Sequence, residues 1–422
     1  MPKRVLLIHQ AFTSKDDAGG TRHFELGKRL VAQGDSFTVV TSDTAYLTGE
    51  KVNARKSFVT ATTEDGIRIL RTYTLAGMHK TYTARVFAFL GFMVLSVAVG
   101  LCSGRPDLVM GTTPPIFQAV SAWILSVLFR RPFLLEVRDL WPAFAIDIGL
   151  LKNPVLIGIA RFVENFLYAR ADHILVNSPA YRDYLIAKGI ARERISFIAN
   201  GVDPAMFVPN DDGGALRAQF GLEREFVCTY AGAIGMANDI DVVVEAAEYL
   251  KDRADIRILI VGDGKERKRL AELVRQRGLK NVIFTGSFPK SQMHKVLAAS
   301  DACIGILRNI PMFKTTYPNK IFDYMAASRP TLLAIDGVIR EVVEAAHGGI
   351  YVCPGDPLAL AKAIRDLADN PGQAREMGAN ARKYVIEHFN RDDQARAFVD
   401  LISSLSARPF ACHVPTDAVK TR

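Results

Sequence analysis

Two glycines near the start of the chain precede an expected helix. Gly19 and Gly20 follow a short apolar run, and the helix is expected from Thr21. Glycines before a helix let backbone N–H groups approach an anion, and the helix dipole favours negative charge there. The spacing is neither GxGxxG nor that of a P-loop. The segment is therefore a candidate phosphate-binding turn, and a plain tight turn is the alternative.

A charged pair follows an apolar strand in the first half of the chain. Arg138 and Asp139 come directly after the expected strand Phe133–Val137. A carboxylate at a strand end can orient an acceptor hydroxyl, and an arginine can hold a phosphate. We predict that Asp139 and Arg138 are catalytic residues. A structural Arg–Asp pair is the alternative.

A second glycine turn opens the second half of the chain. Gly235 and Met236 lie between the expected strand Phe226–Ala231 and a helix. Backbone amides in such a turn could bind a phosphate. We therefore predict a second phosphate contact at Gly235 and Met236, with a tight connection as the alternative.

The most specific of the four segments runs from Tyr317 to Ala327. Pro318 and Asn319 introduce a helix that carries Lys320 and Asp323. Lys320 is a candidate for binding a diphosphate, together with Asn319 at the start of the helix. Asp323, about one turn later, could accept hydrogen bonds from both hydroxyls of a ribose. A solvated Lys–Asp pair at (i, i+3) spacing is the alternative.

The sequence gives no reason to expect a metal or a cofactor. Asp239 and Asp241 form a DxD pattern, but they stand where a helix opens, and aspartate is favoured there for capping reasons. The histidines show no ligand spacing. The five cysteines form no CxxC pair, and Cys228 and Cys303 lie in apolar strand-like runs. We infer a reducing compartment, no structural zinc and no bound metal.

Two successive series of strands and helices surround these segments. The chain of 422 residues is too long for one compact core and suits two large domains. Alternating strands and helices predict a parallel sheet in each domain, with ligands at the carboxyl ends of the strands. The strands expected in the first series are Val5–His9, Phe37–Thr41, Ile67–Arg71, Leu108–Gly111, Phe133–Val137, His173–Asn177 and Ile195–Ile198. Those expected in the second are Phe226–Ala231, Ile256–Val261, Val282–Thr285, Ala302–Ile306, Thr331–Ala334 and Ile350–Cys353.

These patterns predict an α/β protein with two Rossmann-like domains that face a central cleft. We expect one domain over residues 1–205 and a second over 206–388. A terminal helix at 389–407 is expected to pack back on the first domain, and 408–422 are expected to form a disordered tail.

A long apolar segment interrupts the first domain. Residues 86–104 contain no charge and are nearly long enough to cross a bilayer at ~1.5 Å per residue. The strands on either side should belong to one sheet, so we do not expect the segment to cross. Arginines flank it and the next apolar helix, at positions 85, 105, 130 and 131, which fits an interfacial anchor. A core helix is the alternative.

The net charge of +9 lies mostly in the first 200 residues, which have 24 Lys and Arg against 16 Asp and Glu. This asymmetry predicts a polyanionic partner such as anionic lipid or a lipid diphosphate. Nucleic acid is not expected, because the basic half lacks interleaved aromatic residues.

Together, these segments resemble glycosyltransferase family 4, of the retaining GT-B type, over nearly the whole chain. The likeness is greatest to a fucosamine-transferase-like branch used in bacterial surface polysaccharide assembly. The residues that carry it are Gly19–Arg22, Thr112–Pro115, Val137–Pro142, Ala199–Asp203, Tyr230–Gly232 with Gly235–Ala237, Gly262–Gly264 and Pro318–Ala327.

The chain departs from the family pattern at the donor site. The family usually has two glutamates eight positions apart; Thr315 stands at the first, which contacts the donor sugar, and Asp323 at the second, which binds ribose. Ala233 and Asn238 stand where an arginine and a lysine are usual. Lys320 could supply the missing positive charge, with Arg308 or Lys314.

The resemblance implies a metal-independent hexosyltransferase-type enzyme, with an acceptor-binding domain over residues 1–205 and a nucleotide-sugar-binding domain over 206–388. It would transfer a sugar, expected to be an N-acetylated amino sugar, from a UDP-sugar to an undecaprenyl-diphosphate-linked acceptor. Its place would be O-antigen or capsule synthesis at the cytoplasmic face of the inner membrane, as a peripheral or monotopic protein. The alternatives are an inactive GT-B protein that binds nucleotide sugar or lipid, and a UDP-sugar epimerase.

Overall fold

The computed structural model describes residues 2–14, 20–44, 51, 57–74, 82–207, 213–222 and 224–410. They form two compact units. The first contains the described residues of 1–12, 22–198 and the chain from Ala395 on; the second contains those of 13–21 and 199–394. The division after Ile198 lies a few residues before the boundary expected at 205.

The first unit is built on an eight-stranded sheet with the order β3-β4-β2-β1-β5-β6-β7-β8. All neighbouring strands are parallel except β3 and β4. The chain moves outward from β1 in one direction to β2 and in the other to β5, so the strand order reverses at β1. The strands are β1 (Arg4–Ile8), β2 (Ser36–Ser42), β3 (Val59–Glu64), β4 (Ile67–Thr72), β5 (Leu108–Thr113), β6 (Phe133–Val137), β7 (His173–Val176) and β8 (Ile195–Phe197).

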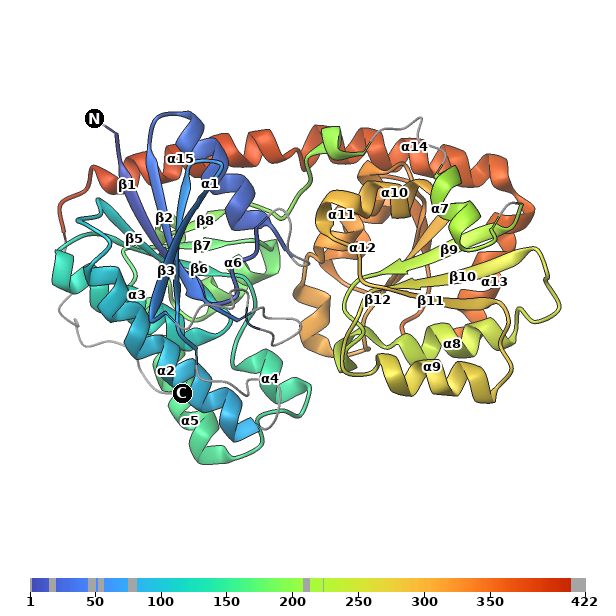
Figure 1. The fold of residues 1–422 in the computed structure, drawn as a ribbon, viewed down its shortest axis with the longest axis horizontal. Coiled ribbons are helices and arrows are strands. Elements are labelled where there is room, and N and C mark those ends of the chain that lie inside the picture. Colours follow the sequence, from blue (N-terminus) through green and yellow to red (C-terminus); the bar gives the residue numbers. More distant parts are fainter. Residues whose placement is uncertain are drawn as a thin grey trace. The chain divides into compact units, whose positions relative to one another are not determined.

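Helices cover both faces of this sheet (Figure 1). Alternate strand residues such as Leu7, Val39 and Met110 form one buried cluster with side chains of α1 and α15. On the other face, α2 packs on β2 and β4, and α3 packs on β1, β5 and β6. The helices are α1 (Arg22–Ala32), α2 (Tyr82–Leu101), α3 (Ile116–Phe129), α4 (Ala143–Asp147), α5 (Pro154–Arg170), α6 (Pro179–Ala187) and α15 (Arg391–Ser406), with a 3-10 turn at Arg192–Arg194.

The second unit has a six-stranded, wholly parallel sheet with the order β11-β10-β9-β12-β13-β14. Its strand order reverses at β9, between β10 and β12. The strands are β9 (Phe226–Ala231), β10 (Ile256–Val261), β11 (Val282–Gly286), β12 (Ala302–Ile306), β13 (Thr331–Ala334) and β14 (Gly349–Tyr351).

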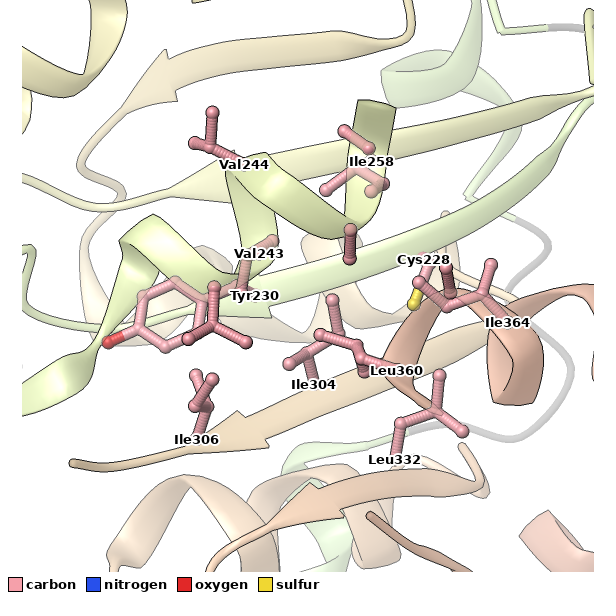
Figure 2. Close-up of a cluster of buried hydrophobic side chains, with 14 of the residues drawn as sticks. Cys228, Tyr230, Val243, Val244, Ile258, Ile304, Ile306, Leu332, Leu360 and Ile364 are labelled. Atoms are coloured by element: carbon pink, nitrogen blue, oxygen red, sulfur yellow. The ribbon is translucent and has the colours of Figure 1, made fainter. Parts of the chain in front are cut away.

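One large apolar core holds the second unit together. Inward positions of β9 and β12, such as Tyr230 and Ile304, meet Val243 of α8 and Ile364 of α13 (Figure 2). Cys228 and Cys303 are both buried in these strands, as their apolar surroundings in the sequence predict. The helices are α7 (Gly214–Gln219), α8 (Ile240–Glu248), α9 (Arg267–Gln276), α10 (Met293–Ala298), α11 (Asn319–Ala326), α12 (Val338–Ala345), α13 (Pro357–Asp369) and α14 (Pro371–His388). The 3-10 turns are Pro204–Met206, Met236–Asn238, Lys290–Gln292 and Pro311–Thr315.

The predicted α/β class and the strand series are confirmed, and one strand was missed. β3 is the outermost strand and pairs antiparallel with β4 alone. Its sequence, VTATTE, is polar and mostly exposed, so it carries no apolar signal that a strand prediction could use. Within the described residues, no helix is both long and apolar enough to cross a membrane.

Candidate functional site

In the first unit, polar side chains gather where β1, β5 and β6 end. His9 follows β1, Thr112 and Thr113 end β5, and Arg138 follows β6. Because these strands are parallel neighbours, their carboxyl ends lie at one edge of the sheet, beside the point where the strand order reverses. Open α/β sheets bind their ligands at this edge.

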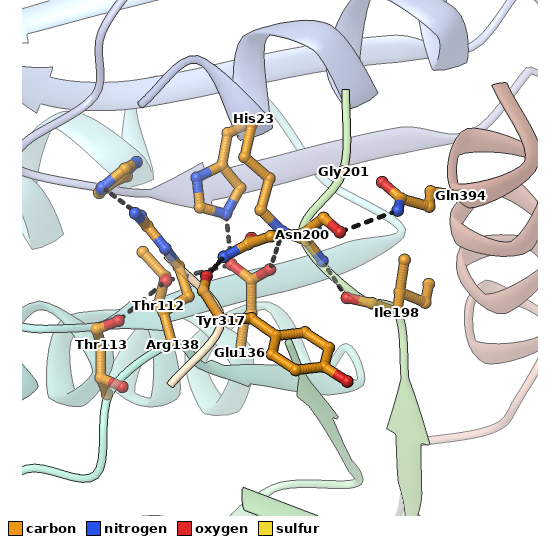
Figure 3. Close-up of polar contacts among 12 residues, drawn as sticks. His23, Thr112, Thr113, Glu136, Arg138, Ile198, Asn200, Gly201, Tyr317 and Gln394 are labelled. Atoms are coloured by element: carbon orange, nitrogen blue, oxygen red, sulfur yellow. Dashed lines mark hydrogen bonds and ion pairs between the residues drawn. The ribbon is translucent and has the colours of Figure 1, made fainter. Parts of the chain in front are cut away.

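A buried carboxylate organises this edge. Glu136, near the end of β6, accepts a hydrogen bond from Nε of Arg22 at 2.9 Å and one from Oγ1 of Thr112 at 3.2 Å, and it is also bonded to His23 (Figure 3). Arg22 also donates to the carbonyl of Ile198 at 2.8 Å. Burial favours a raised pKa for Glu136, but the charges of His23 and Arg22 outweigh it, and the pKa lies well below its usual range. The carboxylate is therefore ionised at neutral pH.

Arg138 is held against this network by a histidine. Its Nη1 lies 3.3 Å from Nε2 of His9, and the His9 ring lies 4.6 Å from the ring of His23. Burial, then the charges of His23 and Arg138, lower the pKa of His9 well below its usual value. A neutral His9 can accept a hydrogen bond from Arg138 through Nε2, which fixes the direction of the guanidinium.

Asp139 lies next to Arg138 at the same edge and is partly buried. Its Oδ1 accepts a hydrogen bond from the hydroxyl of Tyr181 at 3.5 Å. Burial raises the pKa of Asp139 to about 6, although Arg138 and Tyr181 oppose the shift. At neutral pH Asp139 is therefore mostly ionised, and its carboxylate can accept a hydrogen bond from a hydroxyl group.

In the second unit, Lys320 lies in the first turn of α11 and points to the end of β9. Its Nζ donates to the hydroxyl of Tyr230 at 2.9 Å and to Oδ1 of Asn238 at 3.2 Å. It also lies 4.2 Å from the centre of the Tyr230 ring. All of these partners are neutral, and burial lowers the pKa of Lys320 to about 7.

Asp323 does not pair with Lys320. Its Oδ2 accepts a hydrogen bond from Nζ of Lys290 at 2.6 Å, and both side chains are largely buried. The alternative of a solvated Lys320–Asp323 pair is therefore wrong, because each residue has its own partner elsewhere in the unit.

The start of α11 presents further polar groups. Pro318 precedes the helix without a side-chain cap, and Oδ1 of Asn319 is buried without a hydrogen-bond partner among the described residues. Gly20 belongs to this unit by its contacts, and a Cβ added there would lie 3.5 Å from Nδ2 of Asn319. Thr315 turns its hydroxyl back to the carbonyl of Met312 at 2.6 Å. Gly19 lies outside the described residues.

The predicted glycine turn after β9 lies next to Lys320. Gly235 has an extended backbone and precedes the 3-10 turn Met236–Asn238, whose Asn238 accepts from Lys320. Next to this turn, the backbone at Gly262 passes close to the backbone at Gly232. A Cβ added at Gly262 would lie 1.8 Å from the carbonyl oxygen of Gly232. The third and fourth sequence segments therefore meet in one place.

Sequence reasoning missed the residues that support these groups. His9 contacts Arg138, and the His9 ring lies against His23, which is bonded to Glu136. Tyr230 and Lys290 contact Lys320 and Asp323, respectively. Glu136 carried a usable signal, since a charged residue inside the apolar strand FLLEV must have a buried partner. The remaining partners come from segments far apart in the sequence. The described residues contain no group of three or more His, Cys, Asp or Glu arranged to hold a metal ion.

Two families match the chain in succession. Residues 18–201 match the family described as glycosyl transferase 4-like domain. Residues 214–384 match the family described as glycosyl transferases group 1. The first match covers strands β2 to β8 of the first sheet, and the second match covers all six strands of the second sheet.

Individual relatives have low sequence identity to this chain, but their matches extend over more than half of it. A provisionally named colanic acid biosynthesis glycosyl transferase, WcaI of Escherichia coli K12, is 25% identical over 89% of this chain and 94% of its own length. The alpha-galactosylglucosyldiacylglycerol synthase of Streptococcus pneumoniae is 25% identical over 57% of this chain and 65% of its own length.

Solved structures share the fold. A sucrose-phosphate synthase from Thermosynechococcus elongatus has a TM-score of 0.75 and 22% identity, with 96% of this chain and 99% of that chain covered. Anabaena HepE, solved with UDP-glucose, has a TM-score of 0.73 and 19% identity, with 96% and 100% covered. The chain is therefore a glycosyltransferase with the GT-B fold, in which a glycosyl transferase 4-like domain precedes a glycosyl transferases group 1 domain.

Proposed function

We propose that this glycosyltransferase moves a sugar from a UDP-sugar to a lipid-linked acceptor, with retention of the anomeric configuration. The observation that best supports binding of a UDP-sugar is the environment of Lys320. The amine of Lys320 lies at the end of β9 and beside a glycine turn, and its hydrogen-bond partners among the described residues are neutral. Burial lowers its pKa to about 7, and an anion bound next to it would stabilise the charged ammonium form. A sugar diphosphate supplies that anion.

The other groups proposed to bind the donor lie mostly near Lys320 in the second unit. The amides of Gly235 and Met236 and the start of α11 near Asn319 are suited to phosphate oxygens. Asp323, fixed by Lys290, would accept from the ribose hydroxyls. Gly19 and Gly20 would approach the diphosphate, and Thr315 would lie near the sugar. The solved HepE complex, which shares the fold, contains UDP-glucose.

In the first unit, Asp139 would orient the acceptor hydroxyl, and Arg138, fixed by His9, would contact a phosphate of the acceptor or donor. The acceptor oxygen forms a bond to the anomeric carbon as the bond to the diphosphate breaks. The hydroxyl proton passes to the departing phosphate oxygen on the same face of the sugar. Amides and basic side chains stabilise the leaving diphosphate, and we propose that no metal or cofactor is needed.

We further propose an undecaprenyl-diphosphate-linked acceptor and an N-acetylated amino sugar as the transferred group, in O-antigen or capsule synthesis. WcaI, whose name refers to colanic acid biosynthesis, supports polysaccharide assembly. The synthase named for a galactosylglucosyldiacylglycerol product supports a lipid acceptor. The fucosamine-transferase-like branch belongs to this proposal, as does peripheral or monotopic attachment to the cytoplasmic face of the inner membrane.

The test uses the purified full chain with a panel of UDP-sugars and a lipid-linked acceptor. A donor that binds should raise the melting temperature by mass action. Transfer, or slow hydrolysis of that donor, should then be measurable, and Asp139→Asn should lose transfer while keeping donor binding. Donor binding without turnover, unchanged in Asp139→Asn, would indicate an inactive binding protein. Conversion of the donor to its epimer without transfer would indicate an epimerase.

A further inference from the structure

A hollow of about 390 Å³ lies in the first unit, at the amino-terminal ends of β1, β2 and β4. The candidate site lies beyond the carboxyl ends of β1, β5 and β6, so the hollow is at the opposite edge of the same sheet. Its size is within the range of small-molecule sites, about 300–1,000 Å³. We call it the amino-edge pocket. Its polar lining includes Arg4, Asp35, Ser36, Thr38, Arg68 and Arg105.

The alternation along the strands brings polar side chains to this place. Val5 of β1 and Phe37 of β2 are buried in the core that α1 and α15 cover. Successive side chains of a strand point to opposite faces, so Arg4 and Ser36 are on the face that α2 covers. α2 ends before β5 begins, and the loop 102–107 returns to the sheet beside these strand ends. The exposed Arg4 and Ser36 therefore line a hollow between the strand ends and this loop.

Three arginines from different segments border the amino-edge pocket. Arg4 begins β1, Arg68 lies in β4, and Arg105 lies in the loop after α2. Nη1 of Arg68 donates to the carbonyl of Ser103 at 3.1 Å, which holds this guanidinium against the loop. Within the described parts of the chain, the N–H groups of Gly104 and Arg105 have no hydrogen-bond partner, and a Cβ added at Gly104 would meet no atom within 4 Å. Guanidinium forks and open backbone amides are suited to phosphate oxygens.

Most of the acidic side chains around the pocket already have basic partners. The ion pairs are Asp65 with Lys28 at 3.4 Å, Asp107 with Arg4 at 3.4 Å and with Arg131 at 3.8 Å, and Glu64 with Arg71 at 4.0 Å. No ion pair of Arg68 or Arg105 is found among the described residues. Two of the three guanidinium groups therefore have no counter-charge of their own.

One carboxylate and two hydroxyl groups complete the polar lining. Oδ1 of Asp35 accepts a hydrogen bond from the backbone N–H of Lys3 at 2.8 Å, so its side chain is held in place. Ser36 and Thr38 follow it along β2 and add their hydroxyl groups. A carboxylate and hydroxyls would be out of place in a site for a bare anion. They are suited to the hydroxyl groups of a sugar.

We propose that the amino-edge pocket binds a small sugar phosphate. Arg68 and Arg105 contact its phosphate, and Asp35 accepts from its hydroxyl groups, with Ser36 and Thr38 beside them. The pocket shares no residue with the proposed UDP-sugar site, which lies in the second unit. The sugar phosphate is therefore a second ligand, bound together with the donor and not in its place.

The experiment measures binding of glucose 6-phosphate and of inorganic phosphate to the full chain by calorimetry, with and without UDP. The charge variant is Arg68→Gln with Arg105→Gln. Its matched control is Arg161→Gln with Arg192→Gln, which removes two exposed arginines of the same unit. Asp35→Asn tests the sugar contact.

A further variant, Lys320→Met, shows whether a probe binds in the donor site instead. This variant and UDP both act on the second unit, so neither should change binding in the amino-edge pocket.

The wild type should bind glucose 6-phosphate, and UDP should not compete with it. The charge variant should bind it about tenfold to a hundredfold more weakly, because charged hydrogen bonds to the phosphate are lost. Asp35→Asn should weaken binding of glucose 6-phosphate but not of inorganic phosphate, because a carboxylate repels a phosphate. The arginine control and Lys320→Met should bind like the wild type. The charge variant and its control should keep the wild-type melting temperature, since all four side chains are exposed.

Three results would overturn the proposal. The first is wild-type protein that gives no heat of binding with glucose 6-phosphate at millimolar concentrations. The second is an equal loss in the charge variant and its arginine control, which would indicate a general effect of charge. The third is binding that UDP or Lys320→Met abolishes while the charge variant retains it, because the probe would then occupy the donor site. Probe binding in the pocket without any sugar transfer from a UDP-sugar would instead refute the proposed function and leave this site standing.

Discussion

At the scale of single residues, the candidate site depends on groups whose charge is set by what surrounds them. Among the described residues, the hydrogen-bond partners of Lys320 are neutral, whereas Glu136 has Arg22 and His23. The surroundings of Lys320 suit the binding of an anionic ligand. The negative charge of Glu136 is instead compensated within the protein. The two therefore respond differently to substitution.

Lys320→Met should weaken UDP-sugar binding. A hydrogen bond from a charged group contributes about 1.5–3 kcal/mol, so affinity should fall about tenfold to a hundredfold in calorimetry. The free protein should not become less stable, because methionine fills the same space without a buried amine. Lys268→Met, on an exposed position of α9, is the control and should bind normally. Equal losses in both variants would contradict a role for Lys320 in binding.

Donor binding should also depend on pH through Lys320. Burial lowers the pKa of this amine to about 7, and a bound diphosphate would favour its charged form. Above pH 7 the protein should take up a proton as the donor binds, and affinity should fall as pH rises. Calorimetry in two buffers of different ionisation enthalpy measures this uptake, which Lys320→Met should abolish. Because the folded pKa lies below the unfolded one, the stability of the free protein should rise between about pH 7 and 10.

Asp139→Asn should reduce turnover about a hundredfold, since loss of the carboxylate misplaces the acceptor hydroxyl that Asp139 is proposed to orient. In the wild type, turnover should fall as pH drops below about 6, where Asp139 takes up a proton. The pH–rate profile checks this, with donor affinity as the internal control. A profile whose acidic limb is the same in Asp139→Asn would assign that limb to another group.

Glu136→Gln should destabilise the first unit by about 3–5 kcal/mol, because it leaves Arg22 buried without its counter-charge. Urea unfolding measures the loss. The pKa of Glu136 is lower in the folded state, so its stabilisation is present above the pKa of the unfolded state and disappears as pH falls. The loss in Glu136→Gln should therefore be largest near neutral pH, and an unchanged denaturation midpoint would refute this role.

Sequence reasoning proposed residues for the candidate site but did not predict the side chains that contact them. Lys320, Asp323 and Gly235 were proposed because each belongs to a short segment that ends a strand or starts a helix. Tyr230 and Lys290 were missed because their roles depend on contacts across 90 and 33 residues, respectively. Spacing along a chain cannot report contacts of that kind.

At the scale of elements, α15 contributes to the core of the first unit although it is the last helix of the described chain. Ala395, Phe398, Val399, Ile402 and Leu405 belong to the same buried cluster as the strands of the first unit. The sequence predicted a terminal helix at 389–407, and the structure has it at Arg391–Ser406. The sequence could not show that the helix completes a core begun at Val5, because that contact spans most of the chain.

Phe398→Ala should destabilise the first unit by about 3–5 kcal/mol, the usual cost of removing a fully buried phenylalanine. Hydrogen exchange should show faster opening of β1 and β2, while β9 and β10 of the second unit keep their protection. Phe410→Ala, near the end of the described chain and only partly buried, serves as the control. Equal exposure of both sheets in Phe398→Ala would mean that the two units unfold as one.

At the scale of the whole molecule, the repetition of strand and helix was enough to predict two Rossmann-like units, since each period of the pattern repeats a local preference. The assignment of residues to units was less accessible. The described residues of 13–21 belong by their contacts to the second unit although they follow β1 of the first. A short polar segment has no composition that reveals which core it joins.

The position of α15 also has a consequence for how the protein is made. The ribosome synthesises the strands of the first unit long before it reaches Phe398. Until then, the apolar face of the sheet that α15 covers is exposed to solvent. The second unit, by contrast, has all its strands and α-helices in one continuous stretch from α7 to α14. We therefore expect the later half of the polypeptide to finish folding first, and chaperones to bind the waiting N-terminal sheet during synthesis.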